Sequence, residues 1–285
     1  MLKRSTIQLL RFHFSLFLLP VYLFALSQVP VINAKKAVML FFVLHALVYP
    51  SSNGYNSFMD KDETPIGGLS KPMLPTRELY LLSVIMDFIA VLISLYIDTL
   101  LAMGILLYIA ASRCYSYRGI RLKKYPFSGF IIVFFFQGAF IFFLTFYSIQ
   151  SGPKLPVPLI PCLISSLLIG SLYPLTQIYQ HKEDKEDGVT TLSYFLGKKG
   201  TFVFSLVLFL SATILLFFRF NLQGHNNYFI YYLLIMLPVV IYFLKWMRQV
   251  WKNAEEASFS NSLRMNILST ACTTLFFTIL IILNH

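Results

Sequence analysis

Hydrophobic and polar positions along the chain fall into long blocks instead of alternating over a few residues. Apolar segments of roughly 20 residues recur from one end to the other, which is the length that predicts membrane-spanning helices. Nine segments are expected to cross the membrane, at residues 9–29, 37–52, 79–97, 99–113, 128–148, 157–179, 201–219, 227–246 and 265–283. The pattern therefore predicts an all-α polytopic membrane protein in which residues 1–285 form a single transmembrane domain.

The composition narrows the possible classes of function. Of the 285 residues, 57% are hydrophobic and 12% are charged, whereas soluble domains carry about 25% charged residues. A soluble enzyme is therefore excluded. The formal net charge of +11 could indicate nucleic acid, but a chain of membrane spans has no continuous soluble face for a duplex. We expect the lipid bilayer, and no nucleic acid, as a partner.

The basic residues are distributed unevenly between alternate connections. Of the 23 Lys and Arg residues, 19 lie at the N-terminus or in the loops after the second, fourth, sixth and eighth spans. The four exceptions are Lys35, Lys36, Lys154 and Arg219. Because Lys and Arg collect on the cytoplasmic side, we expect the N-terminus and these loops in the cytoplasm, and the protein in a bacterial cytoplasmic (inner) membrane.

A polar stripe is expected where the second span ends. His45, Tyr49, Asn53, Asn56 and Asp60 follow one another in steps of four, four, three and four residues. These steps place the five side chains within roughly 80° of one face of a helix. The stripe leads into a loop that also carries two further carboxylates.

A second stripe with similar spacing follows the sixth span, and consists of Tyr173, Gln177, Gln180, Asp184 and Asp187. Either stripe alone is compatible with a solvated helix end that pairs with nearby lysines. Two stripes at matching depth favour a common binding site. Carboxylate and amide oxygens suit Mg²⁺, which typically bridges protein carboxylates to substrate phosphates. Basic residues of the neighbouring loops would supply the remaining charge for a diphosphate.

Three motifs in this chain resemble those of the UbiA superfamily of intramembrane prenyltransferases. They are Asn56-x-x-x-Asp60, the stretch Tyr115-Ser-Tyr-Arg-Gly-Ile-Arg-Leu-Lys123, and Asp184-x-x-x-Gly188 followed by Thr191-Leu192 and Leu196-Gly197. Their order, their placement in loops on one side and the nine-span layout extend the resemblance over almost the whole chain.

The resemblance implies a nine-helix bundle with a central cavity open toward the cytoplasmic side. It also implies Mg²⁺-dependent transfer of an isoprenyl group from an isoprenyl diphosphate to a small acceptor, for example an aromatic one. On this basis Asn56, Asp60 and Asp184 are the expected catalytic residues and metal ligands, and Asp62 and Asp187 are further metal ligands. The expected substrate-binding residues are Asn53, Lys71, Arg118, Arg121, Lys123 and Gln180.

Two alternatives remain open from the sequence. The family's first motif normally ends in Asp where Thr64 stands, and its second normally begins with Asp where Gln180 stands, so this chain could be a member with altered or lost catalysis. A small-molecule membrane transporter is the other alternative, because Asp87 in the third span is either functional or hydrogen-bonded to a neighbouring helix. We expect His45 to be a satisfied buried histidine and Gln137 to join two helices.

Overall fold

Nine helices are long and apolar enough to cross a membrane in the computed structural model, which describes residues 2–285. They cover Arg4–Gln28, Ala34–Asp60, Arg77–Ile97, Thr99–Ser116, Pro126–Ser148, Leu159–Thr176, Leu192–Leu222, Asn226–Lys252 and Phe259–Asn284. Each corresponds to one predicted span, so the predicted all-α, nine-helix architecture is confirmed. The chain is a multi-pass integral membrane protein.

Several spans consist of more than one helical segment. The segments of the N-terminal part are α1 (Arg4–Leu10), α2 (Phe12–Ser15), η1 (Leu16–Leu18), α3 (Leu19–Gln28), α4 (Ala34–Phe42), η2 (Val43–Val48), α5 (Tyr49–Asp60), α6 (Arg77–Ile97) and α7 (Thr99–Ser116). They are followed by η3 (Leu122–Lys124), α8 (Pro126–Val133), η4 (Phe134–Phe140), α9 (Ile141–Ser148), α10 (Leu159–Leu172), η5 (Tyr173–Thr176), α11 (His181–Glu186), α12 (Leu192–Leu222), α13 (Asn226–Lys252), η6 (Ala254–Glu256) and α14 (Phe259–Asn284).

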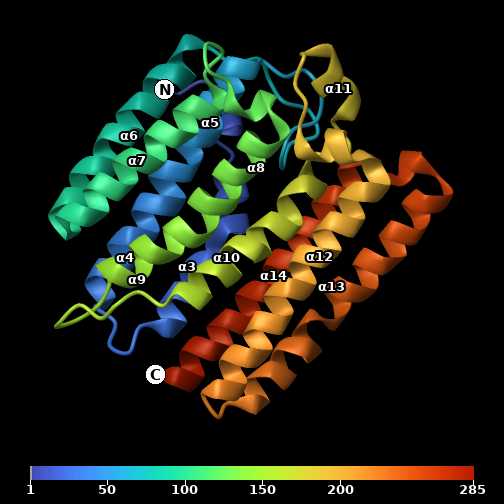
Figure 1. The fold of residues 1–285 in the computed structure, drawn as a ribbon. Helices are drawn as coiled ribbons and strands as arrows, with labels where there is room; N and C mark the ends of the chain where they lie inside the picture. The colour runs from blue at the N-terminus through green and yellow to red at the C-terminus, as the bar shows by residue number, and fades with distance from the viewer. Residues whose placement is uncertain (1) are drawn as a thin grey trace.

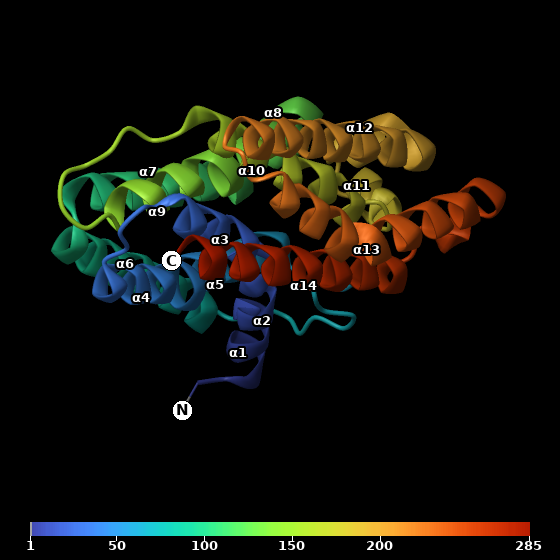
Figure 2. The same ribbon diagram turned by 90° about the horizontal axis from the view of Figure 1, so that it is seen from below.

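The helices form one bundle with two sides. Figures 1 and 2 show α4, α6 and α7 on one side and α12, α13 and α14 on the other, with α3 and α10 between them. α10 packs against α12 and η4, and α14 packs against α3 and α13. The segment that follows α5 and the short helix α11 lie at the same end of the bundle (Figure 1). The two acidic segments are therefore brought to one end, although about 120 residues separate them in the sequence.

A π-helical turn interrupts the second span at η2 (Val43–Val48). Such a turn inserts an extra residue and rotates the side chains before it relative to those after it. His45 consequently leaves the predicted polar stripe, is buried, and contacts the carbonyl oxygen of Ser15 through Nδ1 at 3.1 Å. The expectation of a buried histidine is confirmed, but only Nδ1 is hydrogen-bonded and the buried Nε2 has no partner. The five-residue stripe is wrong at its first position.

The helix boundaries differ from the predicted ones at both acidic segments. The second span does not stop at residue 52 but continues through α5 to Asp60. The next residue, Lys61, caps the helix in a left-handed conformation with φ 56°. The first stripe therefore belongs to the membrane helix itself. The second stripe is not one helix, because the chain turns between η5 and α11.

Small residues bring α10 directly against η4. A Cβ at Gly138 would lie 2.4 Å from the Cα of Ser166, so no side chain fits there without displacing the backbone. The Ser166 hydroxyl also accepts a hydrogen bond from the backbone N–H of Ala139 at 2.9 Å. Close approach of small residues is a common way to pack membrane helices, and it holds α10 against η4 here.

Asp87 in α6 pairs with Arg113 in α7. Ser51 in α5 donates a hydrogen bond to the same carboxylate and lies 3.4 Å from Arg113 Nη2. The Arg113 guanidinium also lies over the ring of Tyr55, 4.0 Å from its centroid. Of the two roles open to Asp87 from the sequence, the structure shows the bond to neighbouring helices, which joins α5, α6 and α7.

Candidate active site

A cavity of about 1300 Å³ lies at the end of the bundle that carries the acidic segments. Its walls come from α5, α7, α8, η4, η5 and α11 and from the segments that follow α5 and α11. Of the site residues named from the sequence, those that line it are Asn53, Asn56, Asp60, Asp62, Lys123, Gln180, Asp184 and Asp187. Asp60 and Asp184 therefore face a common hollow.

The first acidic segment presents Asn53, Asn56 and Asp60 to the cavity from α5. These residues are three and four positions apart, which places them on one face of the helix. The Oδ1 atom of Asn56 accepts a hydrogen bond from the Ser116 hydroxyl at 2.8 Å. This bond holds the middle of the motif against the end of α7.

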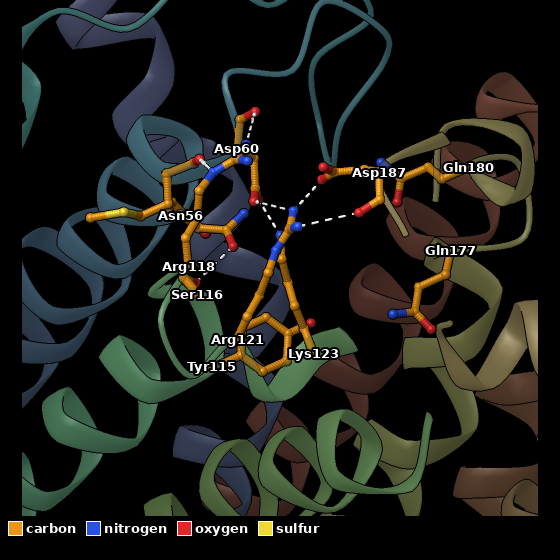
Figure 3. Close-up of polar contacts among 12 residues, drawn as sticks. Asn56, Asp60, Tyr115, Ser116, Arg118, Arg121, Lys123, Gln177, Gln180 and Asp187 are labelled. Carbon is orange, nitrogen blue, oxygen red and sulfur yellow. Dashed lines mark hydrogen bonds and ion pairs between the residues drawn. The ribbon is translucent and has the colours of Figure 1, made fainter. Parts of the chain in front are cut away.

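Asp60 is paired with two basic side chains from the segment after α7. Lys123 forms an ion pair with one carboxylate oxygen, and Arg121 Nη2 lies 3.4 Å from the other. Arg121 also pairs with Asp187, so its guanidinium bridges the two acidic segments (Figure 3). The Asp60 side chain is only 4% exposed, and an unpaired carboxylate there would be costly.

The second acidic segment approaches from the other side of the cavity. Gln180 Nε2 donates a hydrogen bond to the Pro65 carbonyl oxygen at 3.2 Å, which joins this segment to the loop after α5. Asp184 accepts a hydrogen bond from the Thr191 hydroxyl at 3.0 Å. Gln177 donates to the Tyr173 hydroxyl at 2.9 Å. The predicted continuous helix is wrong, but all five residues of its stripe line the cavity.

The carboxylates of the two segments differ in their electrostatic surroundings. Burial, followed by the charge of Asp60, raises the pKa of Asp62 to about 6. Burial raises the pKa of Asp184 to about 7, and the charges of Glu183 and Asp62 act in the same direction. Burial also acts to raise the pKa of Asp187, but the hydrogen bond and charge of Arg121 outweigh it and lower that pKa. The cavity thus holds two carboxyl groups that lack a sufficient countercharge.

The donor set of this cavity fits a divalent cation that prefers oxygen ligands. Carboxylate and amide oxygens from both segments converge on it, and the buried Oε2 atom of Glu183 has no hydrogen-bond partner. Within residues 2–285, no three His, Cys, Asp or Glu side chains are grouped closely enough to hold a metal by themselves. A Mg²⁺ ion here would take its remaining ligands from water and phosphate, as Mg²⁺ usually does in protein sites.

Arg11 lines the cavity, although it was not among the predicted site residues. It adopts a left-handed conformation with φ 49° between α1 and α2. Its guanidinium donates to the carbonyl oxygens of Gly67 at 3.1 Å and Asn53 at 3.3 Å. The available signal was an arginine inside the first predicted span, since a charge at that depth is expected to face the protein interior.

Three of the predicted substrate-binding residues, Lys71, Arg118 and Arg121, do not line the cavity. Arg121 contacts it only through its pairs with Asp60 and Asp187. Lys71 is exposed in the loop after α5. Arg118 is also exposed, and its guanidinium donates to the carbonyl oxygens of Met59 at 2.7 Å and Asp60 at 3.3 Å. The structure therefore gives Arg118 a bond to the C-terminal end of α5, and leaves Lys71 outside the site. Gln137, expected only to join helices, also lines the cavity.

The acidic cavity continues into two less polar ones. A cavity of about 760 Å³ shares Asn53, Tyr108 and Gln137 with it. That cavity in turn shares Phe17, Ile169, Leu172 and Thr270 with a third one of about 940 Å³. The third cavity is lined mainly by apolar side chains of α3, α10, α12, α13 and α14, with several Ser and Thr residues among them. A polar site thus adjoins an apolar space within the bundle.

Comparisons with known proteins agree with this arrangement. The model of the UbiA prenyltransferase family matches residues 16–270, so the chain belongs to the UbiA prenyltransferase family. A comparison with curated protein sequences gives no match.

Several solved structures have the same fold. A structure of digeranylgeranylglyceryl phosphate synthase is 22% identical with a TM-score of 0.63, and the match covers 98% of each chain. A UbiA homologue from Archaeoglobus fulgidus bound to DMAPP and Mg²⁺ is 19% identical with a TM-score of 0.69, covering 97% of this chain and 99% of that one. A homologue from Aeropyrum pernix K1 is 18% identical with a TM-score of 0.67, covering 92% and 97%.

Proposed function

We propose that this protein is a Mg²⁺-dependent intramembrane prenyltransferase that moves an isoprenyl group from an isoprenyl diphosphate to a small acceptor. The observation that carries the proposal is the meeting of two acidic segments with Arg11 and Lys123 around one cavity that continues into apolar space. The homologue bound to DMAPP and Mg²⁺ supports both the donor class and the metal. The carboxylates and amides of both segments would hold the cation, namely Asn56, Asp60, Asp62, Asp184 and Asp187.

The reaction begins with breakage of the allylic C–O bond, and the electron pair leaves with the diphosphate. Arg11 and Lys123 face the cavity and would stabilise the charge that develops on the leaving oxygen. Bound Mg²⁺ supplies Lewis-acid stabilisation of the same charge. Arg121 and Lys123 would exchange their carboxylate partners for diphosphate oxygens as the substrate binds.

The allyl cation then forms a bond to an electron-rich atom of the acceptor, which loses a proton. Water would compete for the cation, so the reacting carbon must lie away from solvent. Tyr108, Val133 and Phe136 line the cavity, and Tyr108 also lines the less polar one beside it. These side chains would exclude water from the reacting carbon. The acceptor remains defined only as a small molecule that supplies this nucleophile.

The apolar cavity would hold the isoprenyl tail of the donor. It is linked to the acidic cavity by an intermediate one that shares lining residues with both. The tail would therefore extend from the diphosphate into the bundle.

The predicted orientation places the acidic cavity on the cytoplasmic side of the membrane. This orientation follows from the basic residues at the N-terminus and in the loops after the second, fourth, sixth and eighth spans, together with the positive-inside rule. Transport is less well supported, because Asp87, the carboxylate in the middle of the third span, pairs with Arg113 and does not line the cavity.

The test is transfer by the purified protein in lipid nanodiscs, with labelled isoprenyl diphosphates of increasing length, membrane extract as acceptor source, and Mg²⁺ either present or chelated. We expect an alkylated product, identified by mass, only when Mg²⁺ is present. Asp60→Ala and Asp184→Asn should each abolish it. Glu186→Gln is the matched control, because Glu186 shares α11 with Asp184 but is exposed and does not line the cavity.

Three outcomes would contradict the proposal. Undiminished turnover in Asp60→Ala or Asp184→Asn would remove the acidic segments from the mechanism. Equal loss in Glu186→Gln would show that the effect reflects general destabilisation. A protein that neither binds labelled diphosphate nor forms product with any donor, while remaining folded, would be a family member that has lost catalysis.

A further inference from the structure

A second polar cavity lies at the opposite end of the bundle from the acidic one. It has a volume of about 590 Å³ and lies where α3, α12 and α14 end and α13 begins. Arg219 in α12 lines it, whereas Thr191, directly before the same helix, lines the acidic cavity. The helix is kinked at Gly197, and the 22 residues from there to Arg219 alone correspond to roughly 33 Å. Figure 1 shows the two ends of α12 at opposite ends of the bundle, so the two cavities are separate.

Arg219 points into the bundle instead of extending away from it. Its Nη2 atom donates a hydrogen bond to Gln28 Oε1 at the end of α3, at 3.0 Å. Its Nε atom is buried and has no hydrogen-bond partner. An arginine that served only as an interfacial anchor would extend its head group toward water. This guanidinium is instead held across the cavity with most of its donors unused.

No carboxylate of the protein neutralises Arg219. No Asp or Glu side chain forms an ion pair with it in the described part of the chain. Asp98, in the connection after α6, caps α7 and lies 3.9 Å from Lys154. The first turn of α13 contains no acidic residue either. Arg219 lies in the last turn of α12, where the helix dipole favours a positive charge. That partial charge does not use the remaining N–H donors of the guanidinium, which can bind an external anion.

The geometry points to a binding site for a phosphate group at this cavity. The planar guanidinium presents paired N–H donors that match two oxygens of a phosphate, which a lysine could not do. Gln223 and His225 add polar groups to the wall, and the buried side chains of Phe220 and Leu280 add apolar ones. The phosphate can belong to the head group of a lipid in this leaflet or to a soluble phosphate.

The position of the site favours a role apart from catalysis. It lies where four helices meet, and α14 is tied there to α3 by the hydrogen bond from Asn284 Nδ2 to the Ser27 carbonyl oxygen at 2.8 Å. A phosphate bound to Arg219 would add a bond between α12 and this group. We expect it to stabilise the side of the bundle formed by α3, α12, α13 and α14 without altering the acidic cavity.

The test measures binding directly, by native mass spectrometry of the whole protein released from detergent with a defined additive. The additives are phosphatidylglycerol, diacylglycerol with the same acyl chains, and inorganic phosphate. Wild type should retain phosphatidylglycerol but not diacylglycerol. Arg219→Gln should weaken retention at least about tenfold, as expected for loss of a charge-assisted hydrogen bond. Arg219→Lys should retain phosphatidylglycerol to an intermediate extent, because it keeps the positive charge but lacks the paired N–H donors of the guanidinium.

Lys36→Gln is the matched control, because it removes one positive charge from the same end of the bundle outside the cavity. Retention of phosphatidylglycerol that depends on Arg219 identifies a lipid head group. Retention of inorganic phosphate with the same dependence identifies a soluble source. Equal retention in wild type and Arg219→Gln, or equal weakening in Lys36→Gln, would overturn the inference. Prenyl transfer should be unchanged in Arg219→Gln, so this result is independent of the proposed catalytic function.

Discussion

The ion pair between Asp87 and Arg113 should contribute strongly to the stability of the α5–α6–α7 unit. Their side chains are 13% and 19% exposed, and Ser51 and Tyr55 of α5 contact the same pair. Removing one partner of a fully buried pair costs about 3–5 kcal/mol. Because both side chains here keep some exposure, we expect Asp87→Ala to lower the free energy of unfolding by about 2–4 kcal/mol.

A double-mutant cycle separates the pair from its surroundings. Asp87→Ala, Arg113→Met and the double variant should be unfolded reversibly in mixed micelles. The double variant should recover much of the loss, because it leaves no uncompensated charge in the membrane. Lys154→Gln, which breaks a more exposed pair with Asp98, should cost at most about 1 kcal/mol. If the two single losses simply add in the double variant, the pair is not coupled and the reasoning fails.

Three further predictions concern the cavities. Ile169 lines both of the less polar cavities, so Ile169→Trp should narrow their junction. It should reduce transfer from long-chain donors more than tenfold in kinetic assays and spare one-unit donors; equal loss for all donors would contradict the placement of the isoprenyl tail. The metal-free protein should lose thermal stability as pH rises from about 4 to 7, because the folded-state pKa values of Asp62 and Asp184 are about 6 and about 7 and the unfolded values are near 4. Asp184→Asn should flatten the dependence of melting temperature on pH. A melting temperature that rises with pH in the wild type would show that burial does not govern the pKa values of these two carboxyl groups. Gly138→Leu should prevent α10 from packing on η4 near Ser166. The overpacking should lower the free energy of unfolding by about 3 kcal/mol. A melting temperature equal to that of the wild type would refute this prediction.

The nine spans were predictable because their signal is thermodynamic and local. A run of about 20 apolar residues must leave water whatever its neighbours do. The face that carries Asn53, Asn56 and Asp60 was predictable for a related reason, since α5 is a regular helix after Tyr49 and three- and four-residue steps align on such a helix. The regularity ends at η2, which displaced His45 from the predicted stripe.

The missing parts of the site depend on contacts between distant segments. Arg11 is one basic residue among several near the N-terminus, and only the packing of α1 and α2 against α5 brings it to Asn53 and Gly67. Lys71 was selected for its charge and its place in an acidic loop, but the fold turns that part of the loop outward. Helical periodicity contains no information about either outcome.

The charges of the acidic cavity explain why the basic segment with Arg121 and Lys123 bridges the two acidic segments in space. Asp60 is nearly fully buried, and Lys123 and Arg121 offset the cost of its charge. Asp62 and Asp184 form no ion pair in residues 2–285, and burial keeps their pKa values near 6 and 7 instead. A metal ion and a diphosphate carry charges of opposite sign, so together they can replace these pairs and protons with little change in net charge. The segment with Lys123 and Arg121 therefore offsets the charges of Asp60 and Asp187. Under the proposed function it would be as necessary to the site as the two acidic segments, because it would stabilise them before the substrate binds.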